Sequence, residues 1–404
     1  MRKSILLMKN KDSLSVIIVT IFIDLMGFGI LIPILPTFAS KQLGISDFGI
    51  GAIIAVFSLM QFIFNPVYGR LSDRIGRRPV ILATQSITVF AYILFAFSHN
   101  FTLLFVSRLL AGLGGSNIGA AQAYIADITT KEERSKGMGL IGAAFGLGFI
   151  FGPVIGALLS KYSYSVAGYG AAGFSFLALV FAFFKLPESL KEKKSEGKFQ
   201  FRIFDFAFTK KVILHSPVGF LVVIFFFIIF SFANIYGTYA LLGYKVFHFS
   251  DQQNGMLFGI SGVVGVMIQA GFIRILTKKF ADRTSVLIGL VFTVFGLGLI
   301  PYGGNFLGEA IVISLVAVGT GILQPIIPAM ISKYSPEDQQ GAILGVNQSI
   351  SAFARVLGPL WGGFSFHYLG YQFPFLTGGF FTLIILIVAY FKLNPEKLKA
   401  GLSV

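Results

Sequence analysis

The stretch Gly69-Arg70-Leu71-Ser72-Asp73-Arg74-Ile75-Gly76-Arg77-Arg78-Pro79 places four arginines and one aspartate between two long apolar runs. A charged segment this short cannot lie in hydrocarbon, so we expect a tight turn at a membrane face. The apolar runs on either side are then antiparallel helices. Gly76 and Pro79 suit such a turn, because glycine punctuates helices and proline is accepted where a helix begins.

The composition of the whole chain also indicates a membrane protein. Of the 404 residues, 55% are hydrophobic and 12% are charged, whereas a soluble domain carries about 25% charged residues. No cysteine is present and the four histidines have no metal-ligand spacing, so we expect no disulfide, no metal and no cofactor. A net charge of +15 would favour nucleic acid as the partner of a soluble protein. Here the charge is better explained by membrane topology, and no nucleic-acid partner is expected.

Twelve apolar segments follow one another, and each is near the length of about 20 residues that crosses a bilayer. They lie at 14–38, 48–70, 79–98, 101–126, 137–160, 165–185, 217–242, 252–276, 284–302, 307–332, 341–366 and 371–391. A basic stretch separates the sixth from the seventh. We therefore predict an all-α membrane protein with an N-terminal six-helix bundle, a cytoplasmic linker and a C-terminal six-helix bundle, at residues 1–186, 187–214 and 215–404.

Lysine and arginine are distributed unevenly between the two sides of these spans. With the N-terminus inside, 27 of the 32 basic residues lie on the inner side, and Lys41, Lys161 and Lys245 lie outside. Basic residues beside membrane spans favour the cytoplasmic face. We therefore expect a multi-pass protein of the plasma (bacterial inner) membrane with both termini in the cytoplasm.

The two halves of the chain repeat each other. The pattern Gly148-x-x-x-Gly152-Pro153-x-x-Gly156 returns as Ala354-x-x-x-Gly358-Pro359-x-x-Gly362, with the two prolines 206 positions apart. Small residues four apart let two helix backbones approach closely, and a proline allows a bend. The fifth helix of each half is therefore expected to pack tightly on a neighbour.

Three stretches of the sequence, the basic turn, the Gly148–Gly156 pattern and Phe22-Ile23-Asp24-Leu25-Met26-Gly27-Phe28-Gly29, resemble the major facilitator superfamily. The resemblance is to its 12-helix, tetracycline-exporter-like drug:H+ antiporters in particular. The basic turn is similar to the G-x-x-x-D-R-x-G-R-R signature between helices 2 and 3. The Gly148–Gly156 pattern resembles the antiporter signature of helix 5, and the segment around Asp24 resembles helix 1. The resemblance implies two pseudo-symmetric six-helix bundles around a central cavity.

Asp24 and Arg108 are the candidate proton-coupling residues. A carboxyl about ten residues into the first span costs about 2.5–3.5 kcal/mol to insert, so it must face a cavity or a partner. Such a group can load and release a proton, although a purely structural pair is the alternative. Arg108 matches the family's R-x-x-x-G motif in helix 4 and by resemblance assists proton transfer; the alternative is an arginine that binds helix-end carbonyls.

The inner face carries a candidate latch around the basic turn. We predict that Asp73 and Asp127 share the cations Arg70, Arg74 and Arg77, and the resemblance implies a network that holds the outward-open state. The alternative is that the cations only enforce topology. The predicted latch residues are Gly69, Asp73, Arg74, Gly76, Arg77, Arg78 and Asp127.

Polar and aromatic residues within the spans are the candidates for a substrate cavity, because intramembrane polar groups usually face the bundle interior. They are Phe28, Asn117, Gln122, Asn234, Gln324, Asn347 and Arg355. Arg355 has two open interpretations: an ion pair with Glu309 that holds helices together, or a cation that faces an anionic substrate.

No G-x-x-x-x-G-K-[ST] phosphate loop, catalytic triad or metal site is present, so we expect neither an enzyme nor an ATP-driven pump. We predict a monomeric, proton-coupled antiporter that exports small amphipathic or lipophilic compounds by alternating access. The expected partners are a small-molecule substrate, the proton and the lipid bilayer. A symporter or uniporter for an anionic metabolite, and a non-transporting sensor or scaffold, remain as alternatives. The eighth and ninth spans lack the histidine and the acid of some tetracycline exporters, which argues against tetracycline itself.

Overall fold

The computed structural model describes residues 2–190, 206–215, 218–336 and 339–393, and these are helical apart from short connections, with no strand among them. Contacts divide the chain into two compact units. The first unit comprises Met1–Leu43 and Val56–Ile203, and the second comprises Gly44–Ala55 and Phe204–Val404. The helix α2 (Asp47–Ile75) contributes its first turns to the second unit and the remainder to the first.

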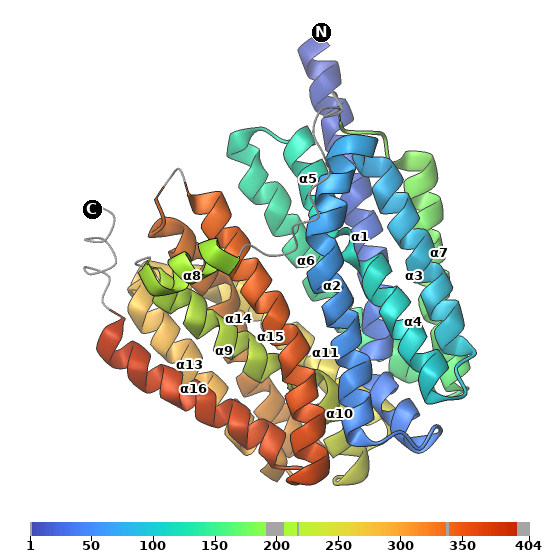
Figure 1. Cartoon of the computed structure of the whole chain (residues 1–404), viewed down its shortest axis with the longest axis vertical. Coiled ribbons are helices and arrows are strands. Elements are labelled where there is room, and N and C mark those ends of the chain that lie inside the picture. Colours follow the sequence, from blue (N-terminus) through green and yellow to red (C-terminus); the bar gives the residue numbers. More distant parts are fainter. Residues whose placement is uncertain (1, 191–205, 216–217, 337–338, 394–404) are drawn as a thin grey trace. The chain divides into compact units, whose positions relative to one another are not determined.

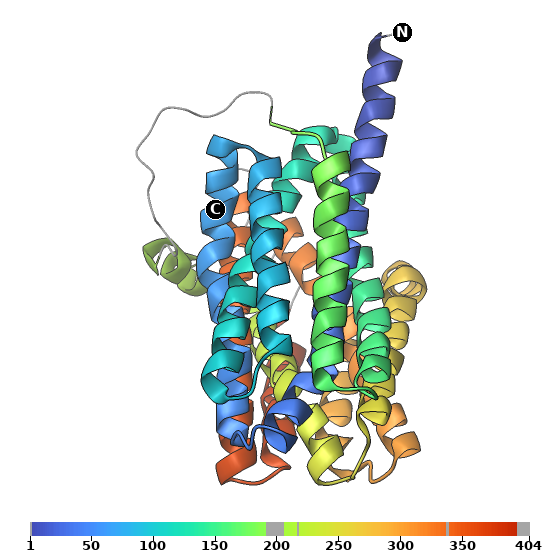
Figure 2. The same cartoon turned by 90° about the vertical axis from the view of Figure 1, so that its right-hand side faces the viewer.

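The first unit is built from six long helical segments, of which one is bent. Besides α2 it contains α1 (Arg2–Lys41), α3 (Arg77–Ala96), α4 (Phe101–Gly114), η1 (Gly115–Asn117), α5 (Ile118–Ile128), α6 (Lys131–Leu159) and α7 (Tyr164–Lys185). The segments α4, η1 and α5 form one span, with non-helical angles at Ser116. Within this unit α1 packs against α6 and α7, and α3 packs against α4 and α7 (Figures 1 and 2).

The second unit repeats this plan with more interruptions. Its elements are α8 (Phe206–His215), α9 (Gly219–Ala233), α10 (Ile235–Lys245), α11 (Asp251–Met267), the π-helical η2 (Ile268–Phe272), α12 (Ile273–Lys279), α13 (Asp282–Leu299), η3 (Ile300–Tyr302), α14 (Phe306–Lys333), α15 (Gln340–Tyr368) and α16 (Phe373–Lys392). The expected seventh span is α9 with α10, divided at Asn234, and the eighth is α11 with η2 and α12. Within this unit α9 packs against α15 and α16, and α13 packs against α14 and α16.

Corresponding glycine contacts show that the two units share their packing. A methyl group added at Gly114 of α4 would lie 2.7 Å from the Thr88 nitrogen of α3. A methyl group added at Gly319 of α14 would lie at the same distance from the Thr293 nitrogen of α13. The same two backbones therefore approach each other in each unit, as expected of a repeated six-helix bundle.

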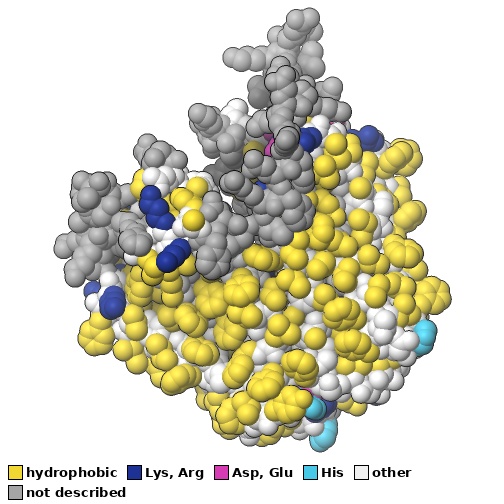
Figure 3. Space-filling view, viewed as in Figure 1, with side chains coloured by type: hydrophobic (Ala, Val, Ile, Leu, Met, Phe, Trp, Pro, Cys, Tyr) yellow, Lys and Arg dark blue, Asp and Glu magenta, His cyan; other side chains and the backbone are white. Residues whose placement is uncertain are grey.

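Eleven of the helical segments in the described residues are long and apolar enough to cross a membrane. The eleventh predicted span, 341–366, forms the continuous helix α15 but is not among them, because Asn347, Gln348 and Arg355 lower its hydropathy. Apolar side chains cover most of the described surface in Figure 3, as lipid contact requires. The predicted all-α membrane fold is thus confirmed. Of the predicted linker 187–214, residues 191–205 lie outside the described residues and 206–214 belong to α8.

Candidate functional site

Asp24 is held in the first unit by side chains from two other elements. The Ser175 hydroxyl of α7 donates a hydrogen bond of 3.1 Å to Asp24 Oδ1, and the Asn117 side chain of η1 also hydrogen-bonds this carboxyl. Ser175 is fully buried, whereas Asp24 keeps part of its surface accessible. The carboxyl is therefore oriented by neutral donors.

The close approach of three helices around Asp24 depends on Gly27, one turn further along α1. A methyl group added at Gly27 would lie 2.9 Å from Ser175 Oγ, 3.0 Å from the Ala171 carbonyl oxygen and 3.3 Å from Tyr92 Cε2. Any side chain here would push α1 away from α7 and from the Tyr92 ring of α3. Gly27 therefore sets the distance from the Asp24 carboxyl to its neighbours.

Arg108 of α4 lies deep in the same unit without an anionic partner. Its side chain is 5% exposed, its guanidinium lies over the Phe57 ring at 4.8 Å, and Nε and Nη1 have no hydrogen-bond partner. No ion pair joins Arg108 to Asp24 in the described part of the chain. A buried guanidinium attracted only by an aromatic face is poorly satisfied. Arg108 is therefore available to an acidic group that comes within its reach.

Tyr92 connects these two residues, and the sequence analysis did not identify it. Its side chain is 2% exposed, and both Asp24 and Arg108 act on its hydroxyl electrostatically. A tyrosine in an apolar helix gives no sequence signal of this kind, because it is common there for packing alone. The tertiary structure alone brings it near both predicted proton-coupling residues, Asp24 and Arg108.

Aromatic rings enclose one side of this group. Phe28 stacks on Phe57 with ring centroids 5.0 Å apart, and Phe149 of α6 meets Phe28 edge-on at 6.1 Å. The predicted cavity residue Phe28 therefore lies one turn from Asp24 and touches the ring that covers Arg108. Gln122 is half-buried on α5, and no side-chain hydrogen bond among the described residues joins it to this group.

The candidates of the second unit do not gather around a carboxyl. Asn234 is 1% exposed and donates through Nδ2 to the Pro374 carbonyl at 2.6 Å, so it joins helices. Asn347 is also buried, and Gln324 is half-buried. The contribution of these three residues to a cavity stays a prediction.

Arg355 of α15 is half-buried, and Tyr236 of α10 acts on it electrostatically. The described residues contain no ion pair between Arg355 and Glu309. Of the two interpretations of Arg355, the geometry therefore gives no support to the helix-holding pair with Glu309.

The predicted latch residues meet at Arg77, the first residue of α3. Arg77 is 6% exposed; its Nη2 lies 2.6 Å from Asp73 Oδ1 and its Nε lies 3.0 Å from Asp127 Oδ2. Its Nη1 also donates to Ser72 Oγ at 2.7 Å. The predicted sharing of a cation between Asp73 and Asp127 is confirmed for Arg77, because one planar guanidinium can serve several acceptors.

Glu188 completes this network, and the sequence analysis missed it. Its carboxylate accepts the backbone N–H groups of Arg77 at 2.9 Å and of Arg78 at 3.2 Å, and so caps the N-terminus of α3. Gly76 has φ 116° at the turn, and a side chain there would collide with the Glu188 carboxylate. The turn thus needs glycine for two reasons. Arg78 is occupied separately, since its Nη2 donates to the Phe183 carbonyl at 2.7 Å.

The glycines of α6 pack directly on the helix that carries Asp24. A methyl group added at Gly152 would lie 2.6 Å from Gly29 Cα, and one at Gly148 would lie 2.9 Å from Leu25 Cβ. Gly156 similarly faces the Ile30 carbonyl, and Pro153 lies within the helix. The predicted tight packing is therefore confirmed, and the neighbour is α1.

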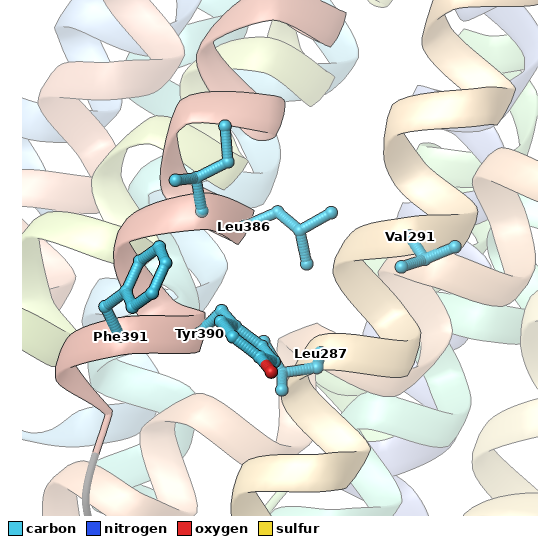
Figure 4. Close-up of a pocket in the computed structure, with 6 residues that line it drawn as sticks. Leu287, Val291, Leu386, Tyr390 and Phe391 are labelled. Carbon is cyan, nitrogen blue, oxygen red and sulfur yellow. The ribbon is translucent and has the colours of Figure 1, made fainter.

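A groove of about 350 Å³ between α13 and α16 lies outside this group (Figure 4). It is lined by Leu287, Val291, Leu386, Ile387, Tyr390 and Phe391. Several of these side chains are exposed, and the lining is apolar. Because such a surface on membrane-spanning helices is suited to lipid acyl chains, we assign it no part in the site.

Comparison with known proteins agrees with the membrane-transporter fold of the chain. The family model described as Major Facilitator Superfamily matches residues 17–306 and 270–403. The chain is 32% identical over 349 residues to the tetracycline resistance protein, class E, of Escherichia coli, which covers 85% of each chain. It is 29% identical to multidrug resistance protein 2 of Bacillus subtilis (strain 168) over 95% of each. The crystal structure of the human organic anion transporter MFSD10 superposes with a TM-score of 0.69 at 25% identity, covering 94% of this chain and 99% of that one.

Proposed function

The chain belongs to the Major Facilitator Superfamily, and from this membership we propose that it is a proton-coupled antiporter that exports small amphipathic or lipophilic compounds. The membrane is the plasma membrane (the bacterial inner membrane), both termini lie in the cytoplasm, and transport proceeds by alternating access in a single chain. The resistance proteins among its relatives support export of drug-like compounds. Antiport of this kind needs one group that binds either a proton or the substrate.

The observation that carries the proposal is the Asp24 carboxyl. It is held by Ser175 and Asn117, and it has no ion pair among the described residues. A carboxylate without a counter-ion in a membrane-spanning helix is stabilised by a proton or by a cationic substrate. Competition between these two for Asp24 couples export of the compound to entry of the proton.

Arg108 and Tyr92 act on the protonation of Asp24 in this proposal. The Arg108 guanidinium has free donors over the Phe57 ring, and Tyr92 feels the charge of both groups. An approach of Arg108 towards Asp24 favours the carboxylate and expels the proton, and its withdrawal favours the acid. A small movement of α4 against α1 is therefore enough to load or unload the carboxyl.

The Arg77 network acts as the latch of the inner face in this scheme. Arg77 holds α2 and α5 through Asp73 and Asp127, and Glu188 fixes the N-terminus of α3. Pairs that are partly exposed are weak enough to break in each transport cycle. We therefore assign the latch a conformational role, separate from the chemistry at Asp24.

Proteoliposomes with an imposed pH gradient test the proposal, with ethidium as the lipophilic probe. Wild-type protein should move ethidium against its gradient, and collapse of the pH gradient with an ionophore should stop the movement. The Asp24→Asn variant should lose this driven transport. The matched carboxyl-to-amide control is Asp282→Asn, which removes an ion pair with Lys333 far along the chain and should retain transport. Driven transport by Asp24→Asn at the wild-type rate contradicts the proposal.

A second candidate substrate class is favoured by one observation, the half-buried Arg355 with no ion pair to Glu309. In a transporter of organic anions this cation would meet the negative group, and the neighbour MFSD10 carries that description. Flux of an anionic dye that is independent of the pH gradient, and lost in Arg355→Gln, would favour this candidate. No flux of either probe would favour the sensor or scaffold interpretation.

A further inference from the structure

Glu309 is a buried carboxyl that the proposed mechanism does not use. It lies in the first turn of α14, in the second unit, and its side chain is 1% exposed. Both carboxyl oxygens are inaccessible to solvent, and the groups next to them, the Tyr239 hydroxyl and the Gly303 backbone, are neutral. It is also the single glutamate of the sequence that falls within the predicted spans.

The surroundings of Glu309 are close and uncharged. Tyr239 of α10, itself 2% exposed, is the titratable group that faces the carboxyl, and its hydroxyl lies within hydrogen-bonding reach of Glu309. The Tyr239 ring packs edge-on against Phe258 of α11 at 5.5 Å. A side chain added at Gly303 would collide with Glu309 Oε1. Neither the elements packed on Glu309 nor its own helix bring a cation to it in the described residues.

An ionised carboxylate is disfavoured in this setting. Burying a charge in a membrane-spanning segment is costly, and a missing counter-ion leaves the cost uncompensated. A neutral acid avoids most of this penalty, so enclosure favours the protonated form of Glu309.

The position of Glu309 also provides a route for releasing the proton. The first turn of a helix stabilises a negative charge, since its backbone N–H groups point towards the side chain. Under the proposed topology this end of α14 lies at the outer face. Opening of the contact between Tyr239 and Glu309 would admit water and make the carboxylate acceptable. Burial and exposure therefore favour opposite protonation states of one side chain.

We infer that Glu309 is a second proton-binding site, in the second unit and separate from Asp24, which binds a proton while it is enclosed and gives it up to water when it is hydrated, once in each cycle. The proton adds to a carboxylate oxygen of Glu309 as the surrounding side chains close over it, and it leaves to water when they part. The inference rests on the proposed antiport, because it assigns Glu309 to the binding of the protons that are exchanged for the exported compound.

The number of protons released when ethidium binds to purified protein tests the inference. It is measured with a pH indicator in weakly buffered detergent solution. Glu309→Gln preserves the shape of the side chain but cannot ionise, so the protons released should fall to about half if Asp24 supplies the other one. The Asp282→Asn control should match the wild type. An unchanged number in Glu309→Gln would overturn the inference and would identify a permanently neutral, structural acid.

Infrared spectroscopy of the wild-type protein gives a second measurement that does not depend on how the variant folds. With ¹³C-labelled glutamate, a carbonyl band of a neutral carboxylic acid at pH 7 should shift, since Glu309 is the glutamate of the sequence that falls within the predicted spans. The absence of a label-shifted band would overturn the inference. If wild-type vesicles show no gradient-driven transport but the band is present, then the proposed antiport fails and the protonation of Glu309 stands.

Discussion

The two units pack their helices alike but differ in the chemistry that this packing encloses. The contact of α6 with α1 corresponds to that of α15 with α9, and the contact of α4 with α3 corresponds to that of α14 with α13. When these contacts are superposed, the positions of Asp24, Tyr92 and Arg108 correspond to Ile228, Leu297 and Ile313. All three of these apolar residues are buried.

This difference shows that the repeated fold does not require polar groups at these positions. Isoleucine and leucine occupy them in the second unit with the same glycine contacts nearby. Since a polar group in a span costs free energy, its presence in the first unit needs another explanation. Transport chemistry at Asp24 supplies one, and the second unit places its own ionisable groups elsewhere, at Glu309 and Arg355.

The largest expected effect comes from making the first unit resemble the second at Asp24. Asp24→Asn should reduce gradient-driven ethidium transport by roughly 100-fold, because the group that exchanges the proton is lost. Asp24→Ile, which copies the second unit, should be as inactive and should insert normally. Uptake into inverted vesicles measures transport, and gel filtration of the purified protein measures folding. An active Asp24→Ile would remove the functional contrast between the units.

Next in size is the effect of a side chain at the glycine contact of α6. Gly152→Ala brings a methyl group within 2.6 Å of the Gly29 backbone, and such overpacking costs about 1–3 kcal/mol of stability. Gly358→Ala in the second unit meets Ala233 Cβ at 2.8 Å and the Phe230 carbonyl oxygen at 2.9 Å. These contacts are slightly longer than those at Gly152, so its cost should be somewhat smaller. Thermal unfolding in detergent compares the two.

The control for this pair is Gly142→Ala, on the same helix as Gly152, where an added methyl group would meet no atom within 4 Å. It should leave the unfolding temperature unchanged or raise it slightly, because alanine favours helix more than glycine does. Equal losses in all three variants would mean that the contact with α1 has no special part in stability.

A moderate effect is expected at the inner face, where Arg77 joins Asp73 and Asp127. Arg77→Lys keeps the charge but cannot bind Asp73, Asp127 and Ser72 at once, so transport should fall about tenfold. The insertion and topology of the protein should be unaltered, as reported by labelling of cysteines introduced into the loops. Transport at the wild-type rate would leave the arginines with topology as their only role.

The smallest effect is expected from Tyr92→Phe, which keeps the ring against Gly27 and removes the hydroxyl. If this hydroxyl stabilises Asp24 or Arg108, its removal costs about 1 kcal/mol, or about fivefold in rate. Tyr92→Leu, as in the second unit, should cost more because the ring packing is lost too. A rate equal to that of the wild type for Tyr92→Phe would restrict Tyr92 to a packing role.

The parts of the site that could be predicted from the sequence are those that are costly or rare in a membrane span. Asp24 and Arg108 are charged residues inside apolar spans, and the glycine pattern of α6 announces a close helix contact. Tyr92, Ser175 and Glu188 could not be found in this way. A tyrosine or serine in a span is ordinary, and a glutamate after a helix is ordinary too. Their importance follows from which neighbour each one meets.

Asn234 and Glu309 were singled out by the sequence, but their contacts could not be predicted from it. The amide was a candidate for the cavity because polar groups in spans are rare, yet its side chain donates to the Pro374 carbonyl between two helices. Glu309 was considered only as a partner of Arg355, and the two form no ion pair in the described residues. Sequence patterns identify a costly side chain but cannot tell which helix face it lies on relative to its neighbours.

The sequence by itself determined the number and order of the helices, the basic turn, the internal repeat and the superfamily. These depend on length, composition and spacing along one chain, and the penalty for placing charge in lipid acts on each span separately. The tertiary structure alone decided that Ser175, Asn117 and Tyr92 surround Asp24, that Arg77 serves two carboxylates, and that Glu309 is enclosed among neutral groups. Those outcomes depend on how each helix is rotated and how closely it packs against helices distant in sequence.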